Sequence, residues 1–122
     1  MSILIVEDEQ PIRNVLTEIL EDEGYRVAGA TNGLEALMYL HQHKPPRLIL
    51  LDLGMPIMTG WEFREQQQHD PRIAEIPVVL MSALPDLNRK AVALKVADCL
   101  DKPVNIDKLL GTVARYVSAR DR

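Results

Sequence analysis

The chain has 122 residues, of which 47% are hydrophobic but only five are aromatic, so the composition predicts one domain with a largely aliphatic core. Eighteen acidic and 14 basic side chains give a net charge of −4 without a basic stripe or tail, which argues against direct nucleic-acid binding. The single cysteine, Cys99, excludes an internal disulfide, and no apolar run approaches the ~18 residues of a membrane span. These features predict a single domain over residues 1–122 of a cytoplasmic protein that does not contact membranes.

Strand-like and helix-like patterns alternate along the chain. Short continuous apolar runs, rich in branched side chains, predict strands that are buried on both faces. Apolar residues at helical spacing between these runs predict helices. The predicted strands are at residues 3–6, 25–30, 48–52, 76–81 and 97–100, and the predicted helices at 11–24, 34–43, 61–69, 87–96 and 106–117.

Two of these helices have apolar residues that are expected to face the core. In the helix at 34–43 they are Leu34, Leu37, Met38, Tyr39 and Leu40. In the last helix they are Ile106, Leu109, Leu110, Val113, Ala114 and Val117. The histidines His41, His43 and His69 lie near predicted helix ends without ligand spacing, so we expect them at the surface.

The segment LILLDLGMPIMTG, from Leu48 to Gly60, is the most informative part of the sequence. Its apolar run ends in Asp52, which therefore lies at the carboxyl end of a central strand, where open α/β sheets bind their ligands. A carboxylate in this place serves as a nucleophile, a metal ligand or a helix N-cap. The segment alone leaves these three roles open.

Five strand–helix units joined by short loops predict an α/β fold with a doubly wound, five-stranded parallel sheet. The common strand order for five such units is the flavodoxin-like order 2-1-3-4-5. Parallel strands bring all their carboxyl ends to one edge of the sheet. The side chains expected together at this edge are those of Glu7, Asp8, Asp52, Ser82 and Lys102.

These side chains suit phosphoryl transfer. Three carboxylates in one crevice repel one another unless a cation neutralises them, and oxygen ligands without histidine or thiolate suit Mg²⁺. An aspartate serves as the nucleophile, while a lysine and a hydroxyl contact phosphate oxygens. Each residue also has a structural explanation: Asp8 and Glu9 as helix caps, Ser82 as a turn residue and Lys102 as a solvated side chain. Complementary chemistry at four strand ends favours the functional interpretation.

Four segments match a known family in sequence and in spacing: ILIVEDE at 3–9, LLDLGMPIMTG at 50–60, PVVLMSA at 77–83 and DKP at 101–103. On these segments the chain resembles the receiver domains of two-component response regulators, over essentially its whole length. The resemblance implies a signalling switch that accepts a phosphoryl group from a histidine kinase or a phosphotransfer protein and then controls a downstream protein partner. It implies Mg²⁺ as cofactor and no enzyme activity beyond self-catalysed phosphotransfer and dephosphorylation.

The resemblance also implies a role for each residue of the cluster. Asp52 would accept the phosphoryl group, and Ser82 and Lys102 would contact its oxygens. The metal ligands would be Asp8, Asp52 and the backbone carbonyl of Gly54, with Glu7 acting through a water molecule.

Two features modify what the resemblance implies. The family usually has Tyr or Phe three residues before the lysine, where this chain has Cys99. The implied change of the face formed by 87–95, 97–101 and the last helix is therefore expected to be weakly cooperative. Gly54 and Leu84 occupy the positions that flank the attacking water, and neither orients it, so we expect slow self-catalysed dephosphorylation.

These residues argue against two other functions and leave a third open. An aspartate-nucleophile phosphatase normally needs a second acid two residues after the nucleophile, where this chain has Gly54. A flavin-binding module needs a phosphate loop after the first strand, where Glu7-Asp8-Glu9-Gln10 would repel a cofactor phosphate. A receiver-like interaction module that is never phosphorylated stays open. The choice between a stand-alone receiver and one excised from a longer regulator also stays open.

Overall fold

Strands and helices alternate along the chain in the computed structural model, which describes residues 2–55, 57–83 and 87–120. The strands are β1 (Ser2–Val6), β2 (Arg26–Ala30), β3 (Leu48–Asp52), β4 (Val78–Ser82) and β5 (Asp98–Asp101). The helices are α1 (Gln10–Asp22), α2 (Gly33–Gln42), α3 (Gly60–His69), α4 (Leu87–Leu94) and α5 (Ile106–Arg120). None of the helices in these described ranges is long and apolar enough to cross a membrane.

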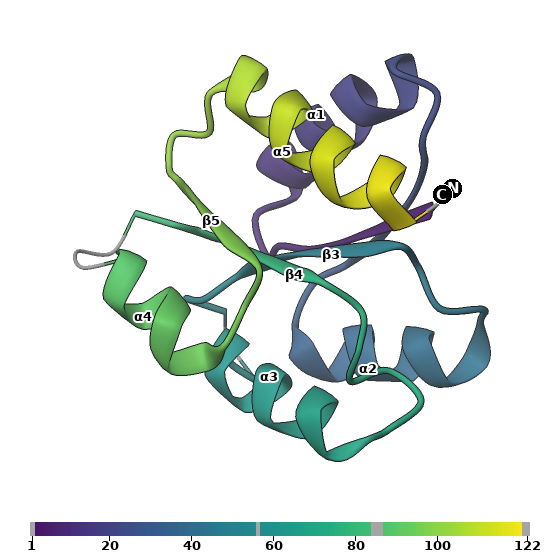
Figure 1. Cartoon of the computed structure of the whole chain (residues 1–122), viewed down its shortest axis with the longest axis vertical. Coiled ribbons are helices and arrows are strands. Elements are labelled where there is room, and N and C mark those ends of the chain that lie inside the picture. Colours follow the sequence, from purple (N-terminus) through teal and green to yellow (C-terminus); the bar gives the residue numbers. More distant parts are fainter. Residues whose placement is uncertain (1, 56, 84–86, 121–122) are drawn as a thin grey trace.

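The five strands form one parallel sheet in the order β2-β1-β3-β4-β5, which confirms the predicted flavodoxin-like α/β fold. Helices α1 and α5 cover one face of the sheet, and α2, α3 and α4 cover the other (Figure 1). Strands β3 and β4 are buried along their whole length. Because both faces of these strands are covered, their sequences are almost continuously apolar up to their last residues, Asp52 and Ser82.

The sheet divides the core into two apolar clusters. Alternate residues of a strand point to opposite faces, so each strand supplies side chains to both clusters. On the α1–α5 side, strand residues Ile3, Ile5, Leu48, Leu50, Val79, Met81 and Leu100 pack against Leu16, Leu20, Leu109, Val113 and Val117. On the other side, Leu4, Val6, Ile49, Leu51, Val78 and Leu80 pack against Ala36, Leu40 and Phe63. Burying each large side chain contributes about 1.5–3 kcal/mol, which holds the strand ends in fixed positions.

Several helix residues that were expected to face the core are exposed. Leu34 and Met38 of α2 are 47% and 54% exposed, and Ile106 of α5 is 52% exposed. Ala114 is exposed as well. The buried residues are Gly33, Ala36 and Leu40 in α2, and Leu109, Val113 and Val117 in α5. These follow a spacing of three or four residues, so the buried stripe of each helix is narrower than its set of apolar residues. The three histidines are exposed, as expected.

Candidate functional site

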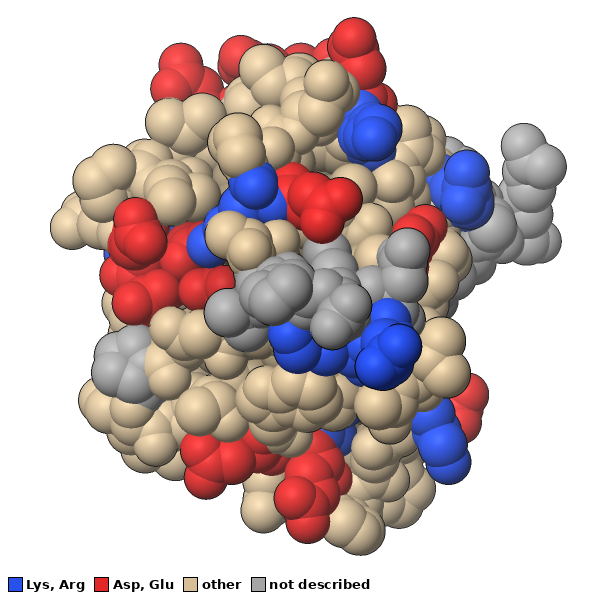
Figure 2. Space-filling view, turned by 90° about the vertical axis from the view of Figure 1, so that its left-hand side faces the viewer, with Lys and Arg blue, Asp and Glu red and all other residues tan. Residues whose placement is uncertain are grey.

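The sheet order brings three carboxylates together at the carboxyl ends of the central strands. Glu7 and Asp8 directly follow β1, Asp52 ends β3, and these two strands are neighbours. One oxygen from each carboxylate lies within 4.8 Å of the others. Glu7 is fully buried and Asp52 is 6% exposed, whereas Asp8 is half-buried. Figure 2 looks onto this edge of the molecule, where acidic side chains gather beside basic ones. The predicted acidic cluster is therefore present, and water solvates it poorly.

Lys102, which follows β5, reaches into this cluster. Its Nζ donates a hydrogen bond of 2.6 Å to Oε1 of Glu7 and lies 3.4 Å from Oδ1 of Asp52. Its backbone N–H donates to the carbonyl of Ser82 at 3.0 Å, which fixes the start of the loop after β5. Lys102 thus offsets one of the three negative charges, and a further cation would relieve the repulsion that is left.

The pairing of Glu7 with Lys102 is visible in both pKa values. Burial raises the pKa of Glu7 and the charge of Asp52 raises it further, although the hydrogen bond from Lys102 acts in the opposite direction. Burial alone would lower the pKa of Lys102, but the hydrogen bond to Glu7 and the charge of Asp52 raise it above its usual value. Lys102 is therefore charged at neutral pH and attracts anionic oxygens.

Ser82 and Gly54 lie beside Asp52. Asp52 pairs with Met81 in the β3–β4 register, so Ser82 extends one residue further along the neighbouring strand, where it is 2% exposed. The backbone N–H of Gly54 lies 3.5 Å from Oδ1 of Asp52, at the outer limit for a hydrogen bond. The residues predicted to bind the metal or the phosphoryl group are therefore all at this edge of the sheet: Glu7, Asp8, Asp52, Gly54, Ser82 and Lys102. Leu84, which was expected to flank the path of the attacking water, lies outside the described residues.

Local hydrogen bonds hold the segment after β1. The backbone N–H of Glu9 donates to Oε2 of Glu7 at 3.2 Å, and the Arg13 guanidinium donates to the carbonyl of Glu7 at 2.7 Å. Glu9 is the N-cap residue of α1, but its side chain makes no capping hydrogen bond. Helix capping therefore does not explain the presence of Glu9 after the strand.

Gly60 permits a close approach of α3 to the end of β3. A Cβ atom at Gly60 would lie 2.7 Å from the carbonyl oxygen of Asp52 and 2.9 Å from Cα of Leu53. Only a residue without a side chain fits there, so this glycine lets α3 begin directly against the strand end that carries Asp52.

Arg64 of α3 forms a buried contact that was not predicted from the sequence. It is 7% exposed, and its guanidinium donates to the carbonyls of Leu94 and Lys95 at 2.9 and 2.7 Å and to Oε1 of Gln67 at 2.8 Å. The arginine lies in a polar helix segment, which predicts a solvated side chain. Arg64 ties α3 to the carboxyl end of α4, close to the face expected to change on signalling.

The donor set of the acidic cluster fits a hard divalent cation. Its three carboxylates come without an imidazole or thiolate partner, and hard cations such as Mg²⁺ prefer oxygen ligands. Asp8 is the most exposed of the three, so an ion can reach the cluster from its side.

Comparisons with known proteins identify the family. The response regulator receiver domain matches residues 3–114. The chain is 28% identical, over 119 residues and 95% of each sequence, to the polar-differentiation response regulator DivK of Brucella anthropi. A signal receiver domain of a histidine kinase from Syntrophus aciditrophicus superimposes with a TM-score of 0.90 and 32% identity, over 99% of this chain and 92% of that one. The Mn²⁺-bound form of response regulator Rcp1 superimposes with a TM-score of 0.81 and 25% identity, over 95% and 94% of the two chains. The chain therefore belongs to the response regulator receiver domains, which act in two-component signalling and are not classical enzymes.

Proposed function

We propose that residues 1–122 form a phosphoacceptor domain in which Asp52 accepts a phosphoryl group from a histidine kinase or a histidine phosphotransfer protein. The observation that carries the proposal is the cluster of Glu7, Asp8 and Asp52 with Lys102 in contact, at the carboxyl edge of a receiver-type sheet. Membership of the receiver family supports it, because a receiver domain implies a cognate kinase.

In the proposed reaction, Asp52 is the nucleophile. One of its carboxylate oxygens attacks the phosphorus of a phosphohistidine, the P–N bond breaks as the P–O bond forms, and the imidazole leaves with the electron pair. Lys102, whose Nζ already lies 3.4 Å from Oδ1 of Asp52, then contacts a phosphoryl oxygen. The Ser82 hydroxyl donates to another, because β4 places it one residue beyond the level of Asp52. The hydrogen bond between Lys102 and Glu7 holds the ammonium group beside the acceptor before the reaction.

We propose Mg²⁺ as the cofactor of this site. Asp8, Asp52 and the backbone carbonyl of Gly54 would hold the ion, and Glu7 would contact it through a water molecule. When bound, the ion neutralises charge on the transferring phosphoryl group. The clustered carboxylates support this proposal, as does the Mn²⁺-bound form of the similar regulator Rcp1.

The proposed output is a change in the face formed by α4, β5 and α5, which controls binding of a downstream protein partner in the cytoplasm. Ser82 is the last residue of β4, and the chain leads from it to α4. A movement of Ser82 towards a phosphoryl group would therefore pull on the segment that enters α4. No direct contact of this chain with nucleic acid is proposed.

Intact-mass measurement after treatment with a small acyl phosphate and Mg²⁺ tests the proposal. The wild-type chain should gain one phosphoryl group, and Asp52→Asn should gain none, because the amide is isosteric but a far poorer nucleophile. Asp101→Asn is a matched control, since Asp101 is an exposed acid at the end of β5, and it should be phosphorylated like the wild type. An adduct that persists on Asp52→Asn would refute the assignment. A wild-type chain that never gains a phosphoryl group would favour the interaction module that is never phosphorylated.

A further inference from the structure

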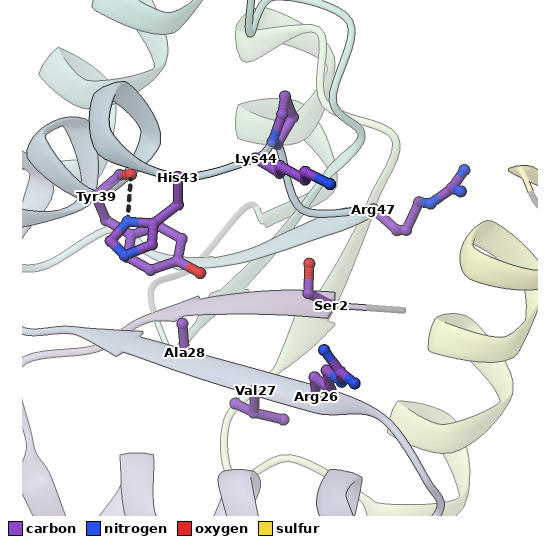
Figure 3. A pocket seen from close by; sticks show the side chains of 9 residues that line it. Ser2, Arg26, Val27, Ala28, Tyr39, His43, Lys44 and Arg47 are labelled. Carbon is purple, nitrogen blue, oxygen red and sulfur yellow. Dashed lines mark hydrogen bonds between the residues drawn. The ribbon is translucent and has the colours of Figure 1, made fainter.

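A pocket lies at the amino-terminal edge of the sheet, at the end opposite the acidic cluster (Figure 3). Its volume is about 490 Å³, within the range of small-molecule sites, roughly 300–1,000 Å³. We call it the basal pocket, and its polar lining consists of Ser2, Arg26, Tyr39, His43, Lys44 and Arg47.

The sheet register gathers three of these polar groups. Ser2 of β1 pairs directly with Arg26 of β2, and on its other side its carbonyl accepts a hydrogen bond of 2.8 Å from the backbone N–H of Arg47. Side chains two residues apart in a strand share a face, so Ser2 points with Leu4, and Arg26 with Ala28, to the side covered by α2. The side chains of Ser2 and Arg26 therefore lie on neighbouring strands and on the same face of the sheet, the one that α2 covers.

The segment that ends α2 forms the facing wall. The rings of Tyr39 and His43 stack with centroids 4.1 Å apart and an angle of 15° between their planes. The backbone N–H and Nδ1 of His43 both lie 3.1 Å from the carbonyl oxygen of Tyr39, which fixes the stack before any ligand arrives. In Figure 3 the Tyr39 hydroxyl, the Lys44 ammonium and the Arg26 guanidinium lie around Ser2 in the pocket.

The pocket is positively charged in a chain whose net charge is −4. Arg26, Lys44 and Arg47 come from three separate segments: β2, the turn after α2 and the residue before β3. Within the described ranges, no ion pair joins Arg26 or Lys44 to a carboxylate. Two cations in a concave site that lack a carboxylate partner in the described part of the chain, here Arg26 and Lys44, concentrate anions from solution. Solvation of single surface side chains explains each cation separately, but it does not explain why three of them line one pocket.

We propose that the basal pocket binds a small phosphate-bearing ligand of the size of a nucleoside monophosphate. Arginine, lysine and a hydroxyl are suited to phosphate oxygens, and arginine binds them in a bidentate geometry. A phosphate group alone fills only part of the volume. The remaining space lies beside the Tyr39–His43 stack and the Ala28 methyl group of β2, where a planar base can pack against aromatic or aliphatic surface. The acidic cluster at the other edge would repel the same ligand.

An NMR titration of the full chain, without divalent metal and at low salt, tests the proposal with AMP, inorganic phosphate and adenosine. AMP should give saturable shifts of the backbone amides at 26–28 and 43–47, inorganic phosphate weaker shifts at the same positions, and adenosine none at equal concentrations. Arg26→Gln combined with Lys44→Gln should weaken AMP binding about tenfold or more, because two charge-assisted contacts are lost.

Arg89→Gln combined with Lys108→Gln removes the same charge from exposed positions elsewhere and should bind AMP like the wild type. Asp52→Asn should also bind it normally, so the result is independent of phosphorylation. No saturable shift with AMP or phosphate would overturn the proposal, as would equal binding of adenosine, or equal weakening in both double variants. Saturation by a short glutamate peptide, but not by AMP, would assign the surface to an acidic protein partner instead and also overturn it.

Discussion

At the residue scale, Gly54 leaves open space beside the proposed acceptor. A Cβ atom at this position would meet nothing within 4 Å, so a side chain can begin there without a clash. We expect Gly54→Asn and Gly54→Glu to shorten the lifetime of phosphorylated Asp52 by several-fold to about a hundredfold, because a polar side chain there can orient the attacking water. Intact-mass time courses after removal of the phosphodonor measure this lifetime. Gly54→Ala adds bulk without a polar group and should leave the lifetime close to that of the wild type. A lifetime that is unchanged or longer in both polar variants would contradict the prediction.

The acidic cluster is expected to make thermal stability depend on Mg²⁺. An ion that binds only the folded chain raises the free energy of unfolding by about 2.7 kcal/mol at one hundred times its Kd. The melting temperature should therefore rise with Mg²⁺ until the site is saturated, and Asp8→Asn should reduce the rise. Melting curves in NaCl of matched ionic strength are the control. A rise no larger than in NaCl would show that the three carboxylates do not form an ion site.

Most of the candidate site could be predicted from residues whose positions depend only on the backbone. Asp52 and Ser82 end strands with strongly apolar sequences, so their place at the sheet edge follows from strand order alone. The structure adds the contacts of the Lys102 Nζ with Glu7 and Asp52, while the expected contact of Lys102 with phosphoryl oxygens stays a prediction. Such contacts depend on side-chain rotamers and burial, which the spacing of motifs does not specify.

At the element scale, Arg64 fixes the carboxyl end of α4 to α3. Burial lowers the pKa of its guanidinium. Three oxygen atoms accept its hydrogen bonds: the carbonyls of Leu94 and Lys95 and the side-chain oxygen of Gln67. Arg64→Met keeps the length of the side chain but leaves these acceptors unpaired. We expect it to lower the free energy of unfolding by about 2–4 kcal/mol, since each unpaired buried acceptor costs about 1–3 kcal/mol and part of that cost is recovered by water.

Urea unfolding curves measure the effect of Arg64→Met. Arg89→Met is the matched control, because Arg89 is exposed on α4, and it should change stability by no more than about 0.5 kcal/mol. Equal stability of the two variants would show that the hydrogen bonds of Arg64 contribute nothing net.

The order and type of the elements were predictable, but their ends and this helix–helix contact were not. β4 begins at Val78, after Pro77, rather than at Ile76, because proline has no N–H to donate to the sheet. It also continues to Ser82, one residue beyond the end of the apolar run. The carbonyls that Arg64 binds, those of Leu94 and Lys95 at the end of α4, are 30 and 31 residues away in the sequence, so no local sequence pattern predicts this contact.

At the scale of the whole molecule, Cys99 affects how far a structural change caused by phosphorylation would extend from the site. Cys99 is partly buried against the cluster beneath α2, α3 and α4, and it pairs with Leu80 across β4 and β5. A thiol buries less apolar surface than an aromatic ring, by about 1–2 kcal/mol. That difference is about a fifth to a third of the roughly 5.5 kcal/mol needed to move an equilibrium from 1:99 to 99:1.

We therefore expect an acyl-phosphate mimic to change backbone chemical shifts near Ser82 and the start of α4, but not concertedly over β5 and α5. Cys99→Tyr should extend the shifts across that face, while Cys99→Ser, which keeps the size of the side chain, should not. A concerted change over α4, β5 and α5 in the wild type, without a partner protein, would show that an aromatic ring at this position is unnecessary.

The close contact of Gly60 with the end of β3 brings the backbone before the chain's tryptophan against the strand that carries Asp52. Trp61 follows Gly60 directly, is the single tryptophan of the chain and is 38% exposed. Because Gly60 packs against the carbonyl of Asp52, the backbone of Trp61 begins one residue away from that contact. We therefore expect ion binding or acylation at Asp52 to change the emission of this one tryptophan, so that either event can be followed by intrinsic fluorescence in the unlabelled wild-type chain.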